Sequence, residues 1–369
     1  MWGHLRGLFF VDYQEIANHG RFLGLVYFLT GFGHQAVMVF FILSGFLISS
    51  SVFKMLATEN WSWTEYAISR AARLYVVLIP GLLLGLLWDT VGSRAFALSG
   101  LYSRPLSGFG SSIAQDNLTI GNFFGNLFFL QTIRCATFGS NGPLWSLANE
   151  FWYYVLFPLA LFAGIAWSKQ AIRKAVLLSV LTAAVSWFVG GPILLGFFIW
   201  LTGTLLVVAH KKLRLPTTGW RRLCIAVSFL LLSICLYSAR MDKWDWIGSD
   251  QAVGVGFALV LLGLLQMDGT SQTSRYPRIT HTFAAFSYSL YALHFPVLLF
   301  LRAWITPGRR WQPDLRHLTM GLLLGGLVVL FAWVTSLFTE NRTSVVRNWL
   351  RAKFRRRSSD GRQSSVGVI

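Results

Sequence analysis

The stretch 141–154 sets polar side chains into an otherwise apolar run, which makes it the part of the sequence best equipped for chemistry. At about 100° per residue, four of these polar residues fall in one arc of a helix: Ser146, Asn149, Glu150 and Tyr153. Glu150 would then lie near the positive end of the helix dipole. Its carboxylate could orient the groups of a reaction centre or supply negative charge there. It could instead have a structural role, as a helix cap or as the partner of another side chain. The spacing leaves both interpretations open.

Histidines in the amino-terminal third are the second candidates. His4, His19 and His34 occupy polar segments that also contain Asp12 and Glu15. An imidazole beside a carboxylate can act as a general base near neutral pH. The spacing alone singles out none of the three histidines.

Two arginines one helical turn apart, Arg70 and Arg73, precede an apolar run. Guanidinium groups at this spacing can grip the phosphates of an anionic cosubstrate. The alternative is simple anchoring at the cytoplasmic face by the positive-inside rule.

A polar stripe follows further along the chain, where Ser287, Tyr291 and His294 recur at i, i+4 and i+7. These side chains share one helix face and either line a cavity or form a hydrogen-bonded seam between helices. In the second case they would help to satisfy a carbonyl that Pro296 frees.

The elements that carry these residues are membrane helices. Hydrophobic residues make up 54% of the 369 residues and charged residues 12%, about half the share usual in soluble proteins. Long apolar runs therefore predict an all-α, polytopic bundle of about nine spanning helices: 36–53, 74–88, 146–167, 171–189, 193–209, 223–237, 251–267, 282–301 and 317–338. We expect 54–73 to be an amphipathic interfacial connector and 122–133, too short to span, to be re-entrant or interfacial.

The first of these helices contains a small, polar notch at Ser44-Gly45, and Ser51 lies on the same face. Small residues of this kind let a neighbouring helix approach closely. The notch therefore predicts a packing contact, or part of a cavity wall.

The formal net charge is +18, but its distribution argues against nucleic acid binding, since the basic residues cluster between apolar runs and in the tail. Residues 169–174, 210–222 and the tail after Arg342 should be cytoplasmic, in contact with anionic lipids. One group departs from this rule, since alternation places Arg309, Arg310 and Arg316 on the outer side. We expect one domain over 1–345 and a basic, disordered cytoplasmic tail over 346–369. The cysteines lack ligand spacing, so no metal site is expected.

Four motifs in this order resemble the acyltransferase-3 family of membrane O-acyltransferases, which act on O-antigen, exopolysaccharide and related glycans. They are Val37-x-x-Phe40-Phe41-x-Leu43-Ser44-Gly45, Arg70-x-x-Arg73-Leu74-Tyr75, Pro143-Leu144-Trp145-Ser146-Leu147-x-x-Glu150 and Tyr288-Ser289-Leu290-Tyr291-x-Leu293-His294-x-Pro296. Glu340-Asn341-Arg342 looks like the closing signature of the family. The family usually opens with a further membrane helix, and Gly3-His4-Leu5-Arg6-Gly7 looks like the end of that helix.

The resemblance implies transfer of an acyl group, most often acetyl from acetyl-CoA, to a sugar hydroxyl of a cell-surface or lipid-linked glycan at the inner (cytoplasmic) membrane. It implies His4 as the catalytic histidine, with Glu150 assisting and Arg70 and Arg73 holding the CoA phosphates. His34, at the mouth of the first predicted helix, is the rival base. The cavity lining would comprise Ser44, Trp145, Ser146, Asn149, Tyr291 and His294. A polytopic transporter or flippase, or an inactive member lacking its first helix, remains the alternative.

Overall fold

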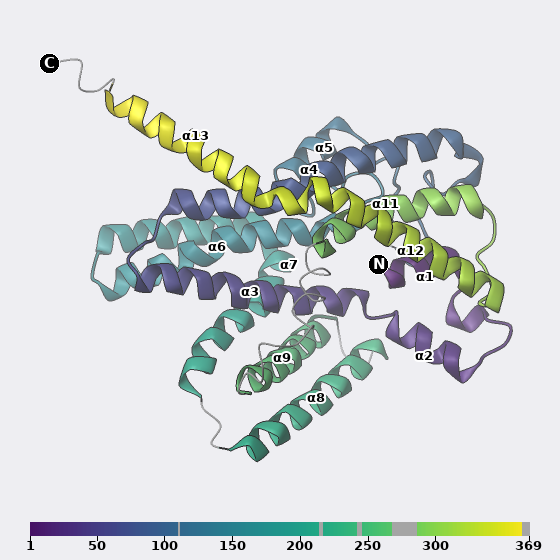
Figure 1. The fold of residues 1–369 in the computed structure, drawn as a ribbon, viewed down its shortest axis with the longest axis horizontal. Helices are drawn as coiled ribbons and strands as arrows, with labels where there is room; N and C mark the ends of the chain where they lie inside the picture. The colour runs from purple at the N-terminus through teal and green to yellow at the C-terminus, as the bar shows by residue number, and fades with distance from the viewer. Residues whose placement is uncertain (110, 214–216, 242–245, 268–285, 364–369) are drawn as a thin grey trace. The chain divides into compact units, whose positions relative to one another are not determined.

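The computed structural model describes residues 1–369 except 110, 214–216, 242–245, 268–285 and 364–369. The regular elements of the described residues are helices, without a β-strand, which confirms the all-α prediction (Figure 1). The helices are α1 (Trp2–Phe9), α2 (Arg21–Leu29), α3 (Gly33–Ala57), α4 (Trp63–Ala95), α5 (Ile120–Leu127), α6 (Trp145–Ser168), α7 (Ile172–Lys212), α8 (Thr218–Arg240), α9 (Trp246–Leu265), α11 (Ser287–Ile305), α12 (Leu315–Phe338) and α13 (Thr343–Gln363).

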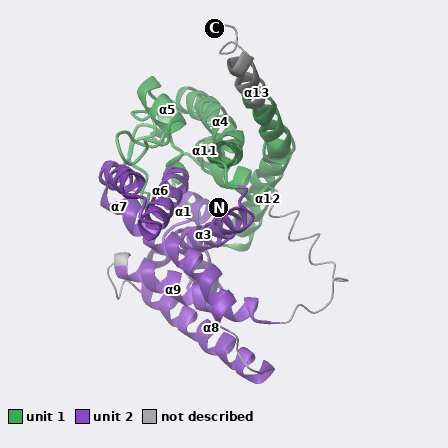
Figure 2. Ribbon diagram, turned by 90° about the vertical axis from the view of Figure 1, so that its left-hand side faces the viewer, with its two compact units in different colours: residues 1, 61–144, 275–369 green, residues 2–60, 145–274 purple. Residues whose placement is uncertain are grey.

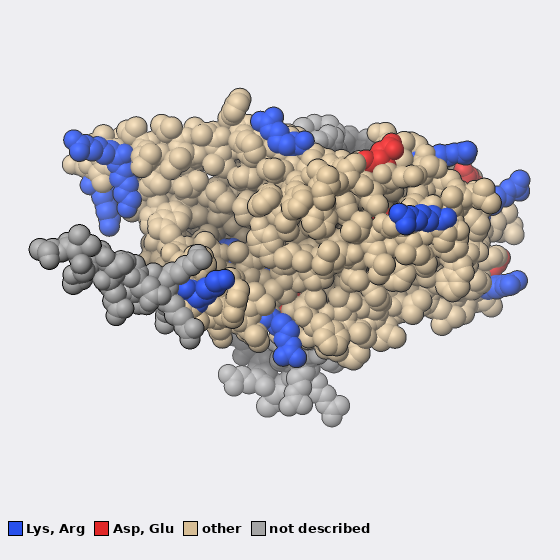
Figure 3. All heavy atoms as spheres, turned by 90° about the horizontal axis from the view of Figure 1, so that it is seen from above, with Lys and Arg blue, Asp and Glu red and all other residues tan. Residues whose placement is uncertain are grey.

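The chain divides into two compact units, each assembled from segments far apart in the sequence (Figure 2). Unit 1 contains Met1, Trp61–Leu144 and Arg275–Ile369, and unit 2 contains Trp2–Asn60 and Trp145–Ser274. The predicted domain over residues 1–345 contains segments of both units. The face drawn in Figure 3 is largely free of charged side chains, as expected for helices surrounded by lipid.

Helices α3, α6 and α7 form the core of unit 2, and small residues bring α3 against α7. A Cβ at Gly45 would overlap the Trp200 carbonyl, and one at Gly203 would overlap the Ile42 carbonyl. The Ser44-Gly45 notch is therefore a helix-packing contact, as predicted. Close backbone approach at small residues is the usual way in which membrane helices pack.

Helix α7 is interrupted at Gly190, whose φ of 78° and ψ of 174° are not helical. This region of backbone torsion space is essentially restricted to glycine. A straight helix of 41 residues would be about 60 Å long at 1.5 Å per residue, twice the thickness of a bilayer core. The break divides α7 into 172–189 and 191–212, each about the length of one span.

The first half of α7 runs antiparallel to α6. Near the end of α6, Trp167 Nε1 donates a hydrogen bond to Ser179 Oγ over 3.1 Å. Near its beginning, the ring centroids of Trp152 and Phe188 lie 5.3 Å apart. As the residue numbers fall along α6, those of the contacting residues of α7 rise, so the two helices are antiparallel.

The second half of α7 runs parallel to α6 and so reverses the chain direction. Tyr153 lies against Gly196, and the ring centroids of Phe157 and Trp200 lie 5.0 Å apart. Eight helices of the described residues are long and apolar enough to cross a membrane. Because α7 folds back on itself, these helices provide nine spans, as predicted from the sequence. The start of the predicted span 282–301 lies outside the described residues, and α11 begins at Ser287.

In unit 1, α4 and α11 lie side by side and run in the same direction. Contacts advance together along the two helices: Arg73 with Tyr288, Gly81 with Ala292, Gly85 with Pro296, and Trp88 with Phe300. The segment 122–133 contains the last part of the short helix α5, which is too short to span.

Two predictions about helix ends differ from the structure. The segment 54–73 is not a separate connector, because α3 extends to Ala57 and α4 begins at Trp63, where Ser62 Oγ accepts the Glu65 N–H over 3.3 Å. The tail predicted as disordered is helical to Gln363, and Arg351 Nε of α13 pairs with Glu65 Oε2 at 2.6 Å.

Candidate active site

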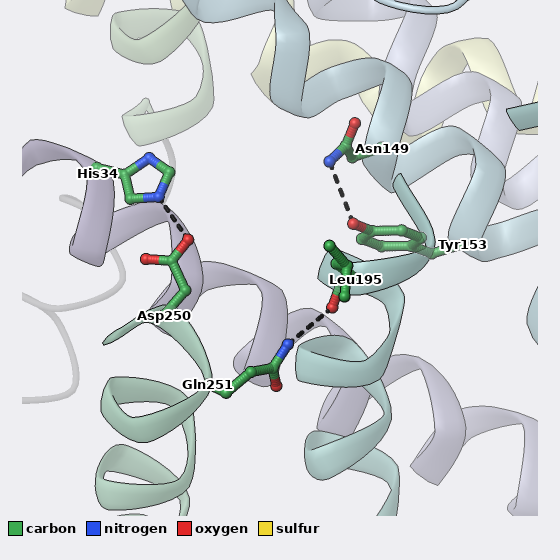
Figure 4. Close-up of polar contacts among 6 residues, drawn as sticks. All are labelled: His34, Asn149, Tyr153, Leu195, Asp250 and Gln251. Carbon is green, nitrogen blue, oxygen red and sulfur yellow. Dashed lines mark hydrogen bonds and ion pairs between the residues drawn. The ribbon is translucent and has the colours of Figure 1, made fainter. Parts of the chain in front are cut away.

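The predicted polar arc of α6 is present and buried within unit 2. Ser146, Asn149, Glu150 and Tyr153 are all at most 5% exposed. Asn149 Nδ2 donates to Tyr153 Oη over 3.2 Å, one helical turn away (Figure 4). The helical spacing therefore correctly identified the face of α6 that is removed from solvent.

Glu150 belongs to a buried hydrogen-bond chain that joins three helices. Its Oε1 accepts the hydroxyl of Tyr154 and, over 3.5 Å, that of Ser44. Trp200 Nε1 in turn donates to Ser44 Oγ over 3.2 Å. This chain brings together two predicted residues, Ser44 and Glu150. Tyr154 could have been found from its i+4 spacing, whereas no local signal marks Trp200.

His34, at the start of α3, is paired with Asp250 of α9. Figure 4 shows the imidazole facing the carboxylate, and Nε2 lies 2.7 Å from Oδ2. Asp250 is 5% exposed, while the His34 side chain is 45% exposed. The second carboxylate oxygen of Asp250 is buried and has no hydrogen-bond partner among the described residues. The ring of Trp145 stacks on His34, with the centroids 5.9 Å apart.

Asp250 is not among the residues predicted for the site, because in the sequence it stands at the end of an acidic stretch that is predicted to be an outer loop. It lies inside α9 instead, and its neighbour Gln251 donates to the Leu195 carbonyl over 3.1 Å (Figure 4). The result is an imidazole with a buried carboxylate behind one nitrogen and an accessible ring surface, the arrangement of an oriented proton acceptor.

His4 lies in α1, also within unit 2. Burial lowers its pKa from the ordinary 6.5 to about 4, so its imidazole is neutral at physiological pH. A Cβ at Gly3 would lie 2.5 Å from the Thr30 carbonyl oxygen, so α1 packs on the connection that leads into α3 and His34. Arg6 reinforces this contact by covering the Tyr27 ring at 4.7 Å.

The predicted donor-binding arginines lie in unit 1. The Arg73 guanidinium lies over the Tyr288 ring at 5.7 Å, and the Arg70 guanidinium over the Tyr66 ring at 5.8 Å. Arg70 also donates to Ser69 Oγ over 3.1 Å.

Beside Arg73, the carboxylate of Glu340 caps the amino-terminal end of α11. Its Oε2 accepts the Ser289 amide (3.0 Å) and the Ser289 hydroxyl (3.1 Å). The charge of Arg73 acts on the same carboxylate. The closing signature thus holds the beginning of α11 next to the Arg73 position.

Of the predicted polar stripe of α11, Tyr291 makes the contact expected of a hydrogen-bonded seam, whereas the carbonyl freed by Pro296 is satisfied from outside the stripe. Pro296 cannot donate to the Ala292 carbonyl, which instead accepts Asn141 Nδ2 over 2.8 Å. Tyr291 Oη donates to the Pro143 carbonyl over 2.8 Å. His294 turns back on its own helix, where Nδ1 lies 2.8 Å from the Tyr291 carbonyl.

The structure therefore groups the predicted residues in two sets, one per unit. Unit 2 contains His4, His34, Ser44, Trp145, Ser146, Asn149 and Glu150, and unit 1 contains Arg70, Arg73, Tyr291 and His294. Within the described residues, no three histidine, cysteine, aspartate or glutamate side chains are grouped to hold a metal ion.

No curated protein and no solved structure matches the chain. A family model described as an acyltransferase domain matches residues 2–337, which is most of the chain. With its apolar helices, the chain is a multi-pass membrane protein that belongs to the acyltransferase-3 family.

Proposed function

We propose that the protein transfers an acyl group, acetyl in the simplest case, from acyl-CoA to a hydroxyl of a sugar in a cell-surface or lipid-linked glycan. The observation that carries this proposal is the His34–Asp250 pair, which lies in the same unit as His4 and the buried Glu150. Acyl transfer to an alcohol requires a positioned proton acceptor, and this end of unit 2 provides two imidazoles and a carboxylate.

In the proposed reaction, the acceptor oxygen attacks the thioester carbonyl carbon and the carbon–sulfur bond breaks. The hydroxyl proton passes to an imidazole, and the CoA thiolate takes up a proton as it leaves. His4 is the first candidate base, because the family resemblance implies it, and its imidazole is unprotonated at neutral pH. His34 is the second, because Asp250 fixes its Nε2 and leaves Nδ1 to accept the proton.

The other predicted residues would act in binding. Arg70 and Arg73 hold the CoA phosphates, a task that suits two guanidinium groups one turn apart. Each guanidinium lies over an aromatic ring, which places the two cations on the same part of α4. Glu150 sets the electrostatic environment of unit 2 through its bonds to Tyr154 and Ser44.

The experiment is to give labelled acetyl-CoA and a glycan acceptor to the purified protein in nanodiscs and measure free CoA and labelled glycan. An acyltransferase releases CoA and labels the acceptor, whereas a transporter or an inactive member leaves the thioester intact. His4→Ala and His34→Ala should identify the base by loss of turnover. His19→Ala is the matched control, because this histidine is exposed and bonds to the nearby Tyr13 carbonyl rather than to a carboxylate.

A wild-type protein that neither hydrolyses nor transfers the acyl group would refute the proposal. If turnover is present but unchanged in both the His4 and the His34 variants, the assignment of the base is wrong although the reaction stands. Circular dichroism of each variant separates loss of catalysis from loss of fold.

A further inference from the structure

Three aromatic residues lie beside Arg70 at the beginning of α4, and the proposed reaction does not use them. They form the aromatic cluster of Trp61, Trp63 and Tyr66, which belongs to unit 1. The segment 61–70 therefore contains both this cluster and one of the two arginines proposed to hold the CoA phosphates.

The rings of the aromatic cluster contact one another in a continuous series. The ring centroids of Trp63 and Trp61 lie 5.2 Å apart with their planes at 84°, and those of Trp61 and Tyr66 lie 5.3 Å apart. The series ends at a cation, because the Arg70 guanidinium lies over the Tyr66 ring. All of these separations are in the range of favourable ring–ring and cation–ring contacts, so the aromatic cluster is an ordered apolar surface next to a cation.

The exposure of the rings changes along the series. Tyr66, which lies under the guanidinium, is 7% exposed, whereas Trp63 at the other end is 45% exposed. The indole of Trp63 therefore keeps accessible ring surface while Trp61 supports it from one side. Such a ring is a surface on which a planar aromatic ligand can stack.

The charges around the aromatic cluster suit a ligand that is anionic as well as planar. The only acidic residue in the segment 61–73 is Glu65, and Arg351 of α13 pairs with its carboxylate at 2.6 Å. A second carboxylate, Glu340, acts on Arg73, one helical turn further from the rings. The carboxylate beside the rings is thus already paired with a cation, which lowers the repulsion that an anionic ligand would meet there.

A nucleotide combines a planar base with phosphates on a single ribose, and acyl-CoA has such a nucleotide at one end. Trp63 and Arg70 are seven residues apart, which corresponds to about 10 Å along a helix. The Arg70 side chain shortens this separation, because its guanidinium reaches back over Tyr66. The base and the phosphates of one nucleotide can therefore contact the indole and the guanidinium at the same time.

We propose that the adenine ring of acyl-CoA stacks on Trp63, while Arg70 contacts the phosphates of the same nucleotide. The inference rests on the proposed function in naming acyl-CoA, and it adds the part of the site that binds the base. Stacking uses the face of the base and not its hydrogen-bonding edges, so other purine nucleotides with the same phosphates should bind similarly. The alternative is that Trp63 only anchors the helix at the membrane interface, where tryptophan is common.

The test compares a ligand that has a base with one that has none. Adenosine 3′,5′-bisphosphate, which is part of CoA, and inorganic pyrophosphate are each titrated into the intact protein in phosphatidylcholine nanodiscs at constant ionic strength, and calorimetry gives the dissociation constants. Trp63→Leu keeps an apolar side chain for the membrane interface but removes the aromatic face. It should weaken binding of the nucleotide at least about fivefold and leave that of pyrophosphate unchanged.

Two further variants are the controls for this substitution. Trp63→Phe restores an aromatic face and should recover most of the lost affinity for the nucleotide. Trp304→Leu changes another exposed tryptophan of unit 1, on α11, and should affect neither ligand. Trp63→Met, which also lacks an aromatic face, replaces Trp63→Leu if circular dichroism shows that the leucine variant does not fold.

The inference is overturned if the wild-type protein does not bind the nucleotide, or if Trp63→Leu binds it as tightly as the wild type. It is also overturned if Trp63→Leu weakens binding of both ligands equally. None of these results decides whether the acyl group is transferred, which the release of CoA and the labelling of the acceptor measure separately. Conversely, a protein that binds the nucleotide through Trp63 but leaves the thioester intact would retain the nucleotide site and refute the proposed reaction.

Discussion

The substitution Gly45→Ala tests whether the α3–α7 contact controls the stability of unit 2. The new Cβ would lie 3.0 Å from the Trp200 carbonyl carbon and still closer to its oxygen, whereas ordinary contact begins at 3.4 Å. To bring the distance from the new Cβ to the carbonyl carbon up to ordinary contact, α3 and α7 must separate by about 0.4 Å. The closer carbonyl oxygen requires a larger separation. The Ser44–Trp200 hydrogen bond, already 3.2 Å long, would then exceed the range of a real hydrogen bond.

The expected cost follows from these two effects. Overpacking in a rigid contact costs about 1–3 kcal/mol. Losing a hydrogen bond between membrane helices adds about 0.6 kcal/mol. Alanine recovers about 0.5–1 kcal/mol through its better helix propensity. The net destabilisation should therefore be about 1–3 kcal/mol.

The measurement is an unfolding titration of the protein with sodium dodecyl sulfate from a mild detergent, followed by circular dichroism. Gly164→Ala is the matched control, because a Cβ at this exposed position of α6 meets nothing within 4 Å. It should be neutral or slightly stabilising. Ser44→Ala removes both hydrogen bonds of Ser44, to Glu150 and from Trp200, without the overlap. At about 0.6 kcal/mol for each bond, it should cost about 1 kcal/mol. Equal midpoints for Gly45→Ala and Gly164→Ala would refute the reasoning.

The remaining predictions concern the site. Asp250→Asn should lower kcat by about 100-fold without changing the KM for acetyl-CoA, because only the orientation of the His34 ring is lost; unchanged kcat would leave Asp250 a structural partner. Glu150→Gln removes the charge but preserves the shape and one acceptor oxygen of the side chain, and we expect turnover to be lost. Retained turnover would show that the charge of Glu150 is not needed. Arg73→Gln should raise the KM for acetyl-CoA about tenfold, while a matched change at exposed Arg94 should not; equal KM values would contradict the donor role. Because the pKa of His4 is about 4 when folded and 6.5 otherwise, the unfolded state takes up the proton first on acidification, so thermal stability should fall from pH 6.5 towards pH 4. His4→Gln should flatten this dependence, and an unchanged pH profile of Tm would argue against burial of His4.

Features that depend on local periodicity were predictable from the sequence. The apolar runs indicate the membrane spans, and the spacing of Glu150 and its polar neighbours indicates the buried face of α6. The small residues at Ser44-Gly45 indicate a packing contact whatever the partner. The start of α4 was also accessible, because Ser62 and Glu65 have the spacing of a capping box, but apolar content outweighed it.

Features that depend on which helices meet were not predictable in this way. His34 and Asp250 are 216 residues apart, and an aspartate beside an acidic loop looks like a loop residue until α9 is placed against α3. Trp200 contributes its indole N–H to the Glu150 chain from the middle of an apolar helix. Such pairings follow from tertiary packing, which hydropathy does not encode.

The torsions of Gly190 determine on which side of the bilayer the rest of the chain emerges. With a reversal at this residue, the connection 169–174 and the basic end of α7 at 210–212 come to one face, where the positive-inside rule would place both. Without it, α7 would cross the bilayer only once, and one of these cationic stretches would lie on the opposite face. A hydropathy profile that merges the two halves of α7 therefore assigns every later loop to the wrong face. A side chain at position 190 would disfavour the reversal, and so would affect the topology of the chain as well as the local backbone.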